Sequence, residues 1–329
     1  MKLLPLLLLP LLCLLSLLWG SADVTPADVW RALASGGAET DTAAFIVRHL
    51  RLPAMLTALT AGCALAASGL VMQTVFANPL ADPSLLGVNA GAGLGAAVAM
   101  LLFGGGLATG VFSLTGRLFV FIAACVGAGG VIVLLLFFSS LFRSNLRLLV
   151  AGVMVSFVAS SLITVLGYFA SASGLQGYVL WGMGDFSSLD GMPLIAFMLL
   201  TVLLLGLLTC RVKTLNALLL GADYAVNLGI DVRRARTLLL LLTGVLSAAV
   251  TALCGPVSFI GLAAPHVARY VHRTADHRRL FPLTLLWGAD IALMAALCTH
   301  LPGGVLLPLN AVTPFFGVPI VLALIMRPR

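Results

Sequence analysis

Charged residues are scarce in this sequence. They make up 9% of the 329 residues, whereas 61% of the residues are hydrophobic and the mean hydropathy is +1.16. A water-soluble domain of this length carries about 25% charged residues. Because apolar runs recur along the whole length, the composition excludes a soluble domain with one anchor and predicts a single integral membrane domain over residues 1–329.

Lysine is almost absent. Only Lys2 and Lys213 occur, and neither follows a glycine in a Gly-x-x-x-x-Gly-Lys-Ser/Thr phosphate loop. No serine nucleophile elbow, His-Glu-x-x-His motif or inward carboxylate pair is present either. The chain is therefore predicted not to be an enzyme, and no ATP hydrolysis is expected on this polypeptide.

Cysteine pairs and basic runs are also missing. The six cysteines all lie in apolar segments without a Cys-x-x-Cys spacing, so they are interpreted as small packing residues rather than disulfide partners or metal ligands. The net charge of +7 does not indicate nucleic acid, because no basic run carries interleaved aromatic residues. No metal site and no nucleic-acid partner is predicted.

The apolar runs predict an all-α fold with about ten transmembrane helices. The predicted spans are 3–20, 52–75, 86–103, 118–138, 148–170, 192–210, 237–254, 257–268, 280–299 and 306–326. The run 257–268 is short for a membrane crossing and is bracketed by Pro256 and Pro265. It therefore predicts a broken helix that is buried in protein or lines a cavity.

The first run has two interpretations. Lys2, followed by a leucine-rich stretch that ends at Trp19-Gly20-Ser21-Ala22, is typical of a signal peptide. Cys13 follows Leu12 and not the small residue of a lipoprotein cleavage site, so lipidation is not expected. A retained first span is favoured over cleavage, and neither outcome changes the orientation of the segments downstream.

The basic residues predict the orientation of the spans. With the first loop outside, the fourteen inner residues are Lys2, Arg143, Arg147, Arg211, Lys213, Arg233, Arg234, Arg236, Arg269, Arg273, Arg278, Arg279, Arg327 and Arg329, and the four outer ones are Arg31, Arg48, Arg51 and Arg117. Cytoplasmic loops carry the excess of Lys and Arg in membrane proteins. A cytoplasmic C-terminus follows, and the N-terminus is cytoplasmic as well if the first span is retained.

Two intramembrane features stand out. Gly87, Gly91 and Gly95 are spaced by four residues, which places them on one helix face and favours close approach of a neighbouring helix. Asp290 is the one strong candidate for an ionisable residue in mid-membrane. Its charge would cost at least about 2.5–3.5 kcal/mol there unless it faces a partner or water, so we expect it to point inward.

Four separate stretches carry a resemblance to a known family. They are Arg51–Ala92 with Asn78-Pro79-Leu80-Ala81-Asp82-Pro83, then Arg147–Gly152 with Trp181-Gly182-Met183-Gly184, then Leu220–Ile230, and finally Gly255–Arg269 with Asp276-His277-Arg278. In this order they resemble the permease subunit of ATP-binding-cassette importers for ferric siderophores, haem and cobalamin. A weaker match at Leu307-Pro308 … Gly317-Val318-Pro319 extends the resemblance to roughly residues 45–326.

The resemblance implies a type II ABC importer permease of ten helices that works as a homodimer in the bacterial cytoplasmic (inner) membrane. Two separate ATPase subunits would bind on the cytoplasmic side, and a periplasmic or lipoprotein-type binding protein would deliver cargo outside. No cofactor is expected on this chain, and ATP with Mg²⁺ would lie on the partner subunit. A ferric siderophore is the first expectation for the cargo, with haem or cobalamin next.

The resemblance also implies roles for individual residues. The predicted cytoplasmic gate is formed by Asn78, Leu80, Ser144 and Asn145. Asn78 and Asp82 could instead act only as helix caps. The residues predicted to couple to the ATPase are Leu220, Gly221, Ala222, Asp223, Leu228, Gly229, Pro265, His266 and Arg269. The segment Thr214–Asp231, with short amphipathic helices broken by Gly221 and Gly229, would fit a groove on an ATPase subunit.

At the outer mouth, the resemblance implies docking of the binding protein on Arg48, Arg51 and His300. The sequence departs from the family pattern at Ala54 and Thr299 there, and at Ala222 and Val226 in the coupling segment. Exposed ion pairs contribute about 0–1 kcal/mol each, so these departures need not abolish docking. The alternatives are an ATP-independent secondary carrier with Asp290 as coupling residue and a non-transporting membrane scaffold.

Overall fold

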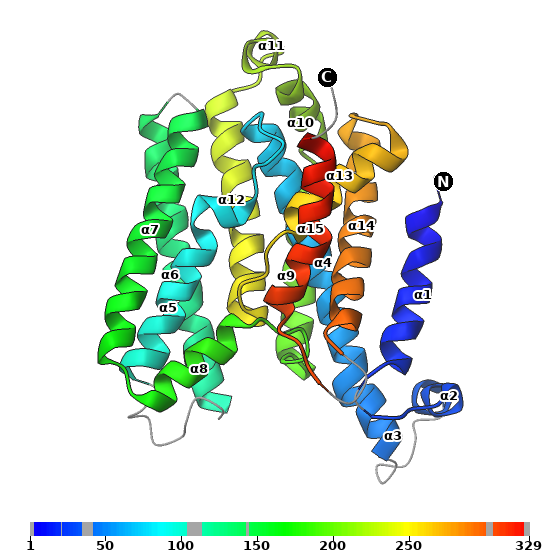
Figure 1. Cartoon of the computed structure of the whole chain (residues 1–329). Coiled ribbons are helices and arrows are strands. Elements are labelled where there is room, and N and C mark those ends of the chain that lie inside the picture. The colour runs from blue at the N-terminus through cyan, green and yellow to red at the C-terminus, as the bar shows by residue number, and fades with distance from the viewer. Residues whose placement is uncertain are drawn as a thin grey trace.

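A computed structural model gives the fold (Figure 1) and describes residues 3–20, 22–34, 42–103, 114–142, 145–300 and 305–325 of the 329. Among these residues, β structure is limited to an isolated bridge between His300 and Leu306. The helices are α1 (Leu4–Leu18), α2 (Pro26–Ala34), α3 (Thr42–Phe45), η1 (Ile46–Arg51), α4 (Leu52–Val75), η2 (Pro83–Leu86), α5 (Val88–Ala97), η3 (Val98–Leu102), α6 (Leu114–Leu141), α7 (Asn145–Phe169), α8 (Ala172–Gly182), α9 (Gly191–Thr209), α10 (Val212–Leu219), α11 (Ala222–Asn227), α12 (Val232–Cys254), α13 (Ile260–His272), α14 (His277–Cys298) and α15 (Leu309–Ile325).

A helix overlaps each of the ten predicted spans. Within the described residues, six helical segments are long and apolar enough to cross a membrane, namely Thr42–Val75, Leu118–Ser139, Leu146–Phe169, Gly191–Thr209, Val232–Cys254 and His277–Cys298. Leu4–Leu18 and Val88–Leu102 are shorter apolar helices. The run predicted to be a broken helix is the 13-residue α13, with Pro265 inside it. The prediction of an all-α polytopic membrane protein is confirmed.

Four short helical segments in the connections were not predicted. They are α2, α3 with η1, η2, and α8. The sequence does mark the start of α8, because the Ser171 side chain accepts a hydrogen bond from the backbone N–H of Gly174 at 3.2 Å. The expected pair of short helices between the sixth and seventh spans is confirmed as α10 and α11, separated by Gly221 at a φ of 116°.

The two ends of the bundle differ in what they carry. Figure 1 shows α10 and α11 at the same end as both chain termini, whereas α2, α3 and α8 lie at the opposite end. We call these the inner end and the outer end. The residues predicted to be cytoplasmic that the structure describes lie around the starts of α7 and α14 and around α10, α12 and α13, whereas Arg31 and Arg48 lie on or beside α2 and α3.

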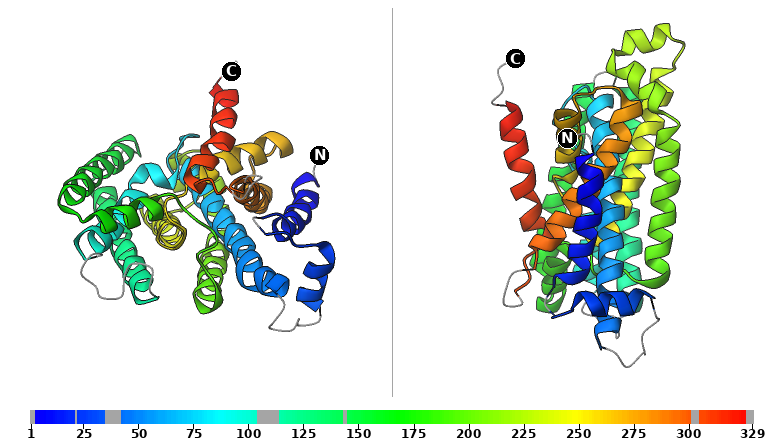
Figure 2. Two further views of the ribbon diagram at one scale, coloured as in Figure 1. Left: turned by 60° about the horizontal axis from the view of Figure 1, so that its bottom comes forward. Right: turned by 90° about the vertical axis from the view of Figure 1, so that its right-hand side faces the viewer.

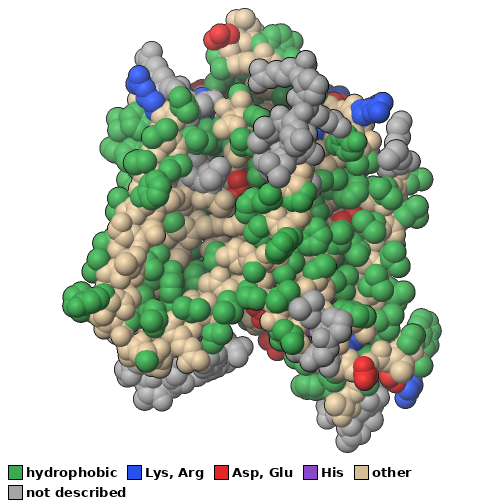
Figure 3. Space-filling model, viewed as in Figure 1, with side chains coloured by type: hydrophobic (Ala, Val, Ile, Leu, Met, Phe, Trp, Pro, Cys, Tyr) green, Lys and Arg blue, Asp and Glu red, His purple; other side chains and the backbone are tan. Residues whose placement is uncertain are grey.

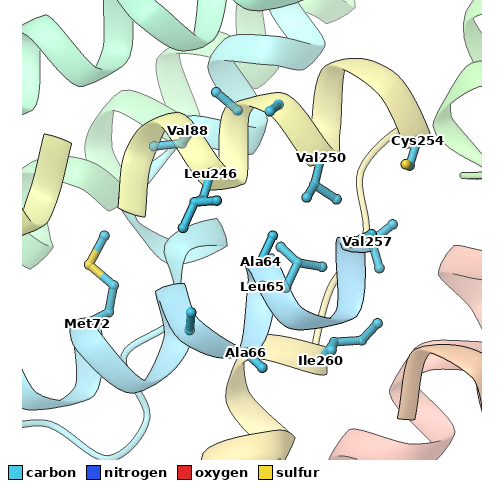
Figure 4. Close-up of a cluster of buried hydrophobic side chains, with 14 of the residues drawn as sticks. Ala64, Leu65, Ala66, Met72, Val88, Leu246, Val250, Cys254, Val257 and Ile260 are labelled. Atoms are coloured by element: carbon cyan, nitrogen blue, oxygen red, sulfur yellow. The ribbon is translucent and has the colours of Figure 1, made fainter. Parts of the chain in front are cut away.

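The central helix of the bundle is α4, which packs against α12, α13 and α14. Small residues allow very close approach: a Cβ on Gly69 would lie 1.8 Å from the Gly261 carbonyl oxygen, and one on Gly62 would lie 2.4 Å from that of Gly288. Figure 4 shows the apolar side chains that pack around α4 from α5, α12 and the segment before α13. The inner half of α4 is consequently buried on every side.

The predicted glycine face forms the contact between α5 and α6. A Cβ on Gly91 would lie 2.6 Å from the Gly127 carbonyl oxygen, and one on Gly95 would lie 2.0 Å from that of Ala123. Gly87 has a different role, because it precedes α5 in a left-handed conformation with a φ of 83°. The prediction of close helix packing is confirmed for the second and third glycines of the series.

Two helices leave much of their apolar surface uncovered. Only 17% of the most apolar 18-residue stretch of α7 is buried. On this helix Phe157 is 63% exposed, Tyr168 is 84% exposed and Phe169 is 76% exposed. On α15, Phe315 is 79% exposed. Figure 3 shows this face covered largely by hydrophobic side chains and hollowed between α5 and α15. In both views of Figure 2, α15 and α9 lie on opposite sides of the bundle.

Candidate functional site

The predicted gate segment follows the inner end of α4. Ala77 takes a left-handed conformation with a φ of 48°, which turns the chain away from the helix axis. The Asn78 side chain then accepts a hydrogen bond from the Leu80 backbone N–H at 3.0 Å, and Leu80 itself is 38% exposed. Asn78 therefore makes the expected local turn, while its backbone N–H donates to the Gln73 carbonyl oxygen at 3.1 Å.

Asp82 ends this turn and begins η2. Its carboxylate accepts hydrogen bonds from the Ser84 backbone N–H at 2.9 Å and from the Ser84 hydroxyl at 2.5 Å, so it caps η2 as expected. Burial raises the pKa of the Asp82 carboxyl above its usual value, and the Ser84 hydrogen bonds oppose that rise. The segment η2 packs against α7, where a Cβ on Gly87 would lie 3.0 Å from the Gly152 carbonyl oxygen.

The gate segment is held by a histidine from α13. His266 Nε2 donates a hydrogen bond to the Pro79 carbonyl oxygen at 2.7 Å, and the His266 side chain is 7% exposed. The inner turns of α13 make a second connection, because Arg269 donates to the Gln73 side-chain oxygen at 2.6 Å. Gln73 also donates to the Leu262 carbonyl oxygen at 3.4 Å. Arg269 thus faces the end of α4 and not the outside of the molecule.

A second set of hydrogen bonds joins α4 to the start of α14 and to α10. His277 Nδ1 donates to the Asn216 side-chain oxygen at 2.9 Å. His277 Nε2 lies 2.8 Å from the Thr74 hydroxyl, which also donates to the Leu70 carbonyl oxygen at 2.9 Å. The His277 backbone N–H also donates to Asn216 at 2.8 Å. The Asn216 amide donates to Asp276 at 2.6 Å. Helix α10 is therefore bonded directly to α14.

Asp276 lies at the inner end just before α14 and caps it. Its carboxylate accepts a hydrogen bond from the Arg278 backbone N–H at 3.0 Å. This bond, together with the Asn216 amide, lowers the pKa of the Asp276 carboxyl below its usual value. Because the folded pKa is depressed, the contact is intact at neutral pH and is lost only as the pH falls through that low value.

These two sets form one connected arrangement, which we call the inner-end network. Its members are Gln73, Thr74, Asn216, His266, Arg269, Asp276 and His277. Gln73 and Thr74 are neighbours on α4, so the bonds run from α10 through α14 and α4 to α13 and the gate segment. Side-chain hydrogen bonds thus join α10 to α14, α14 to α4, α4 to α13 and α13 to Pro79, and the helix backbone links one bond to the next.

Helices α10 and α11 present an exposed apolar surface beyond this network. Leu220, Tyr224, Val226 and Leu228 are 65%, 47%, 58% and 58% exposed. The other predicted coupling residues here, Gly221, Ala222, Asp223 and Gly229, are also exposed. This surface lies outside the bundle at the inner end (Figure 1), where a partner protein can reach it.

The predicted coupling residues fall into two places. Those from Leu220 to Gly229 lie on the exposed surface of α10 and α11, whereas Pro265, His266 and Arg269 lie inside, between α13 and α4. The structure describes only some of the predicted gate residues. Ser144 lies outside the described residues, and Asn145 begins α7, on which η2 packs. Both sets of roles stay predictions.

The three predicted docking residues hold the N-terminal segment at the outer end. Arg51 is 8% exposed and donates to the carbonyl oxygens of Leu17, at 2.7 Å, and Ala22. Arg48 donates to the Ala32 carbonyl oxygen at 2.6 Å. The backbone carbonyl of His300 accepts from the Trp19 indole at 3.1 Å. Their docking role stays a prediction, and in this conformation the Arg51 guanidinium is turned inward.

Asp290 points inward as expected, but it has no partner there. It is 0% exposed, and neither carboxylate oxygen has a hydrogen-bond partner among the described residues. Helix α14, which carries Asp290, packs against α4 and α1. Asp290 is remote from the inner-end network. No group of three or more His, Cys, Asp or Glu residues within the described ranges could hold a metal ion.

Sequence reasoning left part of the network unassigned. Gln73, Asp276 and His277 stood in the recognised motifs but received no role, and Asn216 lay unmarked in the coupling segment. A signal was present for Gln73 and Thr74, which are polar residues at the end of the otherwise apolar span 52–75. The hydrogen-bond partners of Gln73 could not be predicted from the sequence, because Leu262 and Arg269 lie about 190–200 positions away along the chain.

Comparisons of the sequence with known proteins all point to one family of transport proteins. Residues 7–327 match the FecCD transport family. The chain is 36% identical over 325 residues to the vitamin B12 import system permease protein BtuC of Escherichia coli O9:H4 (strain HS), a match that covers 98% of this chain and 93% of that protein. The corresponding protein of Salmonella paratyphi A (strain ATCC 9150 / SARB42) is 37% identical over 324 residues, with the same coverage.

Solved structures show the same likeness. A metal-chelate type ABC transporter in an inward-facing conformation superposes with a TM-score of 0.83 at 29% identity, over 98% of both chains. PsaBC from Streptococcus pneumoniae, in complex with Fab, gives a TM-score of 0.55 at 16% identity, over 85% of this chain and 92% of that one. The second likeness concerns the fold alone.

Proposed function

The chain belongs to the FecCD transport family, and from this premise we propose that it carries a bulky metal chelate inward through the bacterial cytoplasmic membrane. Membership makes the chain a multi-pass permease subunit of an ATP-binding-cassette importer and not an enzyme, with ATP hydrolysis on a separate subunit. The family prediction is thereby confirmed. A permease of this family is neither the ATP-independent secondary carrier with Asp290 as coupling residue nor the non-transporting membrane scaffold.

The observation that supports one cargo over another is the 36% identity to vitamin B12 import permeases across 98% of this chain. We therefore place cobalamin first and the ferric siderophores, which the sequence favoured, second, with haem third. All three are bulky chelates, and the apolar side chains on α7 and α15 would offer them a weakly binding path. The few fixed charges in these helices suit such a cargo better than a naked ion.

In the proposed assembly, two copies of the chain meet through the exposed apolar faces of α7 and α15. Exposed apolar patches of this kind mark interaction sites, and a cargo path between two such faces would lie on the dimer axis. An ATPase subunit with bound ATP and Mg²⁺ would receive α10 and α11 of each copy. A binding protein would deliver cargo at the outer end, which places the C-terminus in the cytoplasm.

The inner-end network then supplies the coupling step. ATP binding would bring the two ATPase subunits together and displace α10 and α11, and the bonds from Asn216 through His277 would pass that displacement to α4 and α13. His266 would move the gate segment through Pro79. The shift between inward-open and outward-open states must come from the different affinities of the two states for nucleotide.

Uptake by proteoliposomes tests this function. The chain is reconstituted with its co-encoded ATPase inside and its binding protein outside, and radiolabelled cobalamin, a ferric siderophore or haem is offered in turn. We expect ATP-dependent accumulation of cobalamin that stops with a Walker-A lysine variant of the ATPase. Accumulation of one of the other chelates would correct the cargo, and accumulation that continues without ATP would overturn the importer mechanism.

A further inference from the structure

An apolar groove runs between α6, α9 and α12 on the side of the bundle opposite α15. It has a volume of about 510 Å³. Among the side chains that line it are Leu118 and Ile132 from α6, Phe197 and Leu200 from α9, and Val245 from α12. Figure 2 shows α9 standing apart from α7 and α15 in both views. The groove therefore lies away from the proposed dimer face and toward the surrounding lipid.

A second cavity, which we call the outer cavity and whose lining is more polar than that of the groove, adjoins the groove at its outer end. This cavity has a volume of about 610 Å³ and shares Phe121, Ser188, Leu189, Asp190 and Leu253 with the groove. Its remaining lining includes the polar residues His49, Asp185 and Ser187. The two spaces together form one amphipathic site, which is apolar where it enters the membrane and polar where α9 begins.

The groove is long enough to cover one leaflet of a bilayer. Leu118 and Ile132 mark its ends on α6, and at 1.5 Å per residue they lie about 21 Å apart along the helix. The hydrocarbon core of a bilayer is about 30 Å thick, so one leaflet accounts for about 15 Å. The groove thus reaches from the outer interface to about the middle of the membrane. An acyl chain of one outer-leaflet lipid has the length and the polarity to occupy it.

The mouth of the groove is negatively charged. Asp185 and Asp190 line this outer cavity, and the part of its lining that the structure describes includes no Lys or Arg. Asp185 accepts hydrogen bonds from Ser187, whereas Asp190 precedes α9 without capping its first turn and is exposed. Its carboxylate is therefore available to an outside group. Such a mouth attracts a cationic head group and repels a net anionic one.

We propose that this site binds a phospholipid of the outer leaflet with a primary-amine head group, such as phosphatidylethanolamine. One acyl chain lies in the groove between α6 and α9, and the ammonium group lies against Asp190 and Asp185. The lipid fills the space that separates α9 from α6 and so supports the outer half of α9, which packs on α4 and α12. The site needs neither nucleotide nor cargo.

Native mass spectrometry of the full chain tests the proposal. The detergent-purified protein is delipidated and titrated with phosphatidylethanolamine or phosphatidylglycerol of identical acyl chains, and the bound lipid is counted. A contact of about 1 kcal/mol corresponds to about a fivefold ratio in binding, so we expect about a fivefold preference for the amine lipid. Asp190→Asn should reduce that ratio, whereas Asp23→Asn, which removes an exposed charge outside the cavity, should leave it unchanged.

A matched glycine pair tests the position of the acyl chain. A Cβ on Gly129 or on Gly130 would meet no atom within 4 Å, but only Gly129 lines the groove. Gly129→Leu should fill the groove and lower the retained lipid several-fold, whereas Gly130→Leu should bind as the unchanged protein does. Equal binding of both head groups, or equal binding by both glycine variants, would overturn the proposal. Neither outcome depends on transport, so failure of the importer function would be seen separately.

Discussion

Single buried polar side chains decide how the inner end of this permease is held. His266 joins the gate segment to α13 through the Pro79 carbonyl oxygen, and Arg269 joins α13 to Gln73. A buried hydrogen bond contributes about 1 kcal/mol net, and more is lost when one partner is left unsatisfied. Each of these side chains is therefore expected to affect the gate without contacting the cargo or the ATPase.

Replacement of His266 tests that expectation. His266→Leu leaves the Pro79 carbonyl oxygen without its donor, so the gate segment should become mobile. A cysteine placed at Leu80 should then react several-fold faster with a maleimide from the cytoplasmic side. His266→Gln keeps a donor and should react at nearly the original rate. Equal rates in all three proteins would show that His266 does not hold the segment.

Replacement of Asp290 is predicted to stabilise the protein. The Asp290 carboxylate is buried with neither oxygen bonded among the described residues, so it contributes a desolvation cost and no contact. Asp290→Leu should raise the thermal unfolding temperature and leave ATP-driven uptake intact, with the lost penalty on the order of 1–3 kcal/mol. Loss of uptake at unchanged ATPase activity and unchanged stability would instead assign Asp290 a direct part in transport.

The contacts between helices carry the next level of the account. Asn216 bonds α10 to α14 through His277 and Asp276. Glycine contacts bring α4 close to α13 and α14. In the proposed mechanism, rigid connections of this kind should transmit a displacement of α10 to the predicted gate segment. Loss of one such connection should separate ATP hydrolysis from transport, whereas loss of a close approach should disturb the fold itself.

Asn216→Ala should uncouple the importer. It removes the three hydrogen bonds that Asn216 makes to His277 and Asp276, while α11 and its exposed surface stay intact. We expect ATPase activity to be retained and uptake per ATP to fall about tenfold, which corresponds to about 1.4 kcal/mol. Thr209→Ala, at the exposed inner end of α9, is the control. A parallel fall of ATPase activity and uptake in the Asn216 variant would contradict a coupling role.

A pair of glycines tests the close packing of α4. Gly69→Ala would place a Cβ 1.8 Å from the Gly261 carbonyl oxygen, so α4 and α13 would have to separate. We expect a fall in unfolding temperature and aggregation during purification. Gly206→Ala on α9 meets no atom within 4 Å and should be neutral or slightly stabilising. A stable Gly69 variant would mean that these helices lie farther apart in the membrane.

Most of the helices could be predicted because the membrane imposes a simple rule. A span needs a long apolar run, and ten such runs in the sequence each overlap a helix. The spacing of Gly91 and Gly95 likewise predicted a close helix contact, which the structure has between α5 and α6. The short helices α2 and α8 were missed because they lie in connections, where no apolar run of span length marks them.

The sequence motifs indicated where the predicted gate and coupling segments lie, but not which hydrogen bonds hold them. The motifs placed the gate and coupling segments at the inner end, yet the partner of His266 is a backbone carbonyl 187 positions away. Backbone acceptors have no sequence signature, so such a contact follows only from the packing of α13 on α4. The same holds for Arg51, whose predicted outward role gave no hint of its hydrogen bonds to Leu17 and Ala22.

One copy of the chain leaves surfaces open that fit contacts with other subunits of an importer. These are the apolar faces on α7 and α15 and the exposed apolar surface on α10 and α11. Residues that are costly to expose in a monomer fit the proposed homodimer and ATPase contacts. The sequence also lacks a phosphate loop, so a working transporter requires a second kind of subunit.

The measurement that tests the account most directly is ATPase activity of the chain in nanodiscs with its co-encoded ATPase, with and without cargo-loaded binding protein. The chain alone should hydrolyse no ATP, and the complex should hydrolyse ATP faster when cobalamin-loaded binding protein is added. Replacement of Leu220 and Leu228 by Asp should abolish association with the ATPase. No association of the unchanged chain with the ATPase, together with no stimulation by any loaded binding protein, would contradict the account.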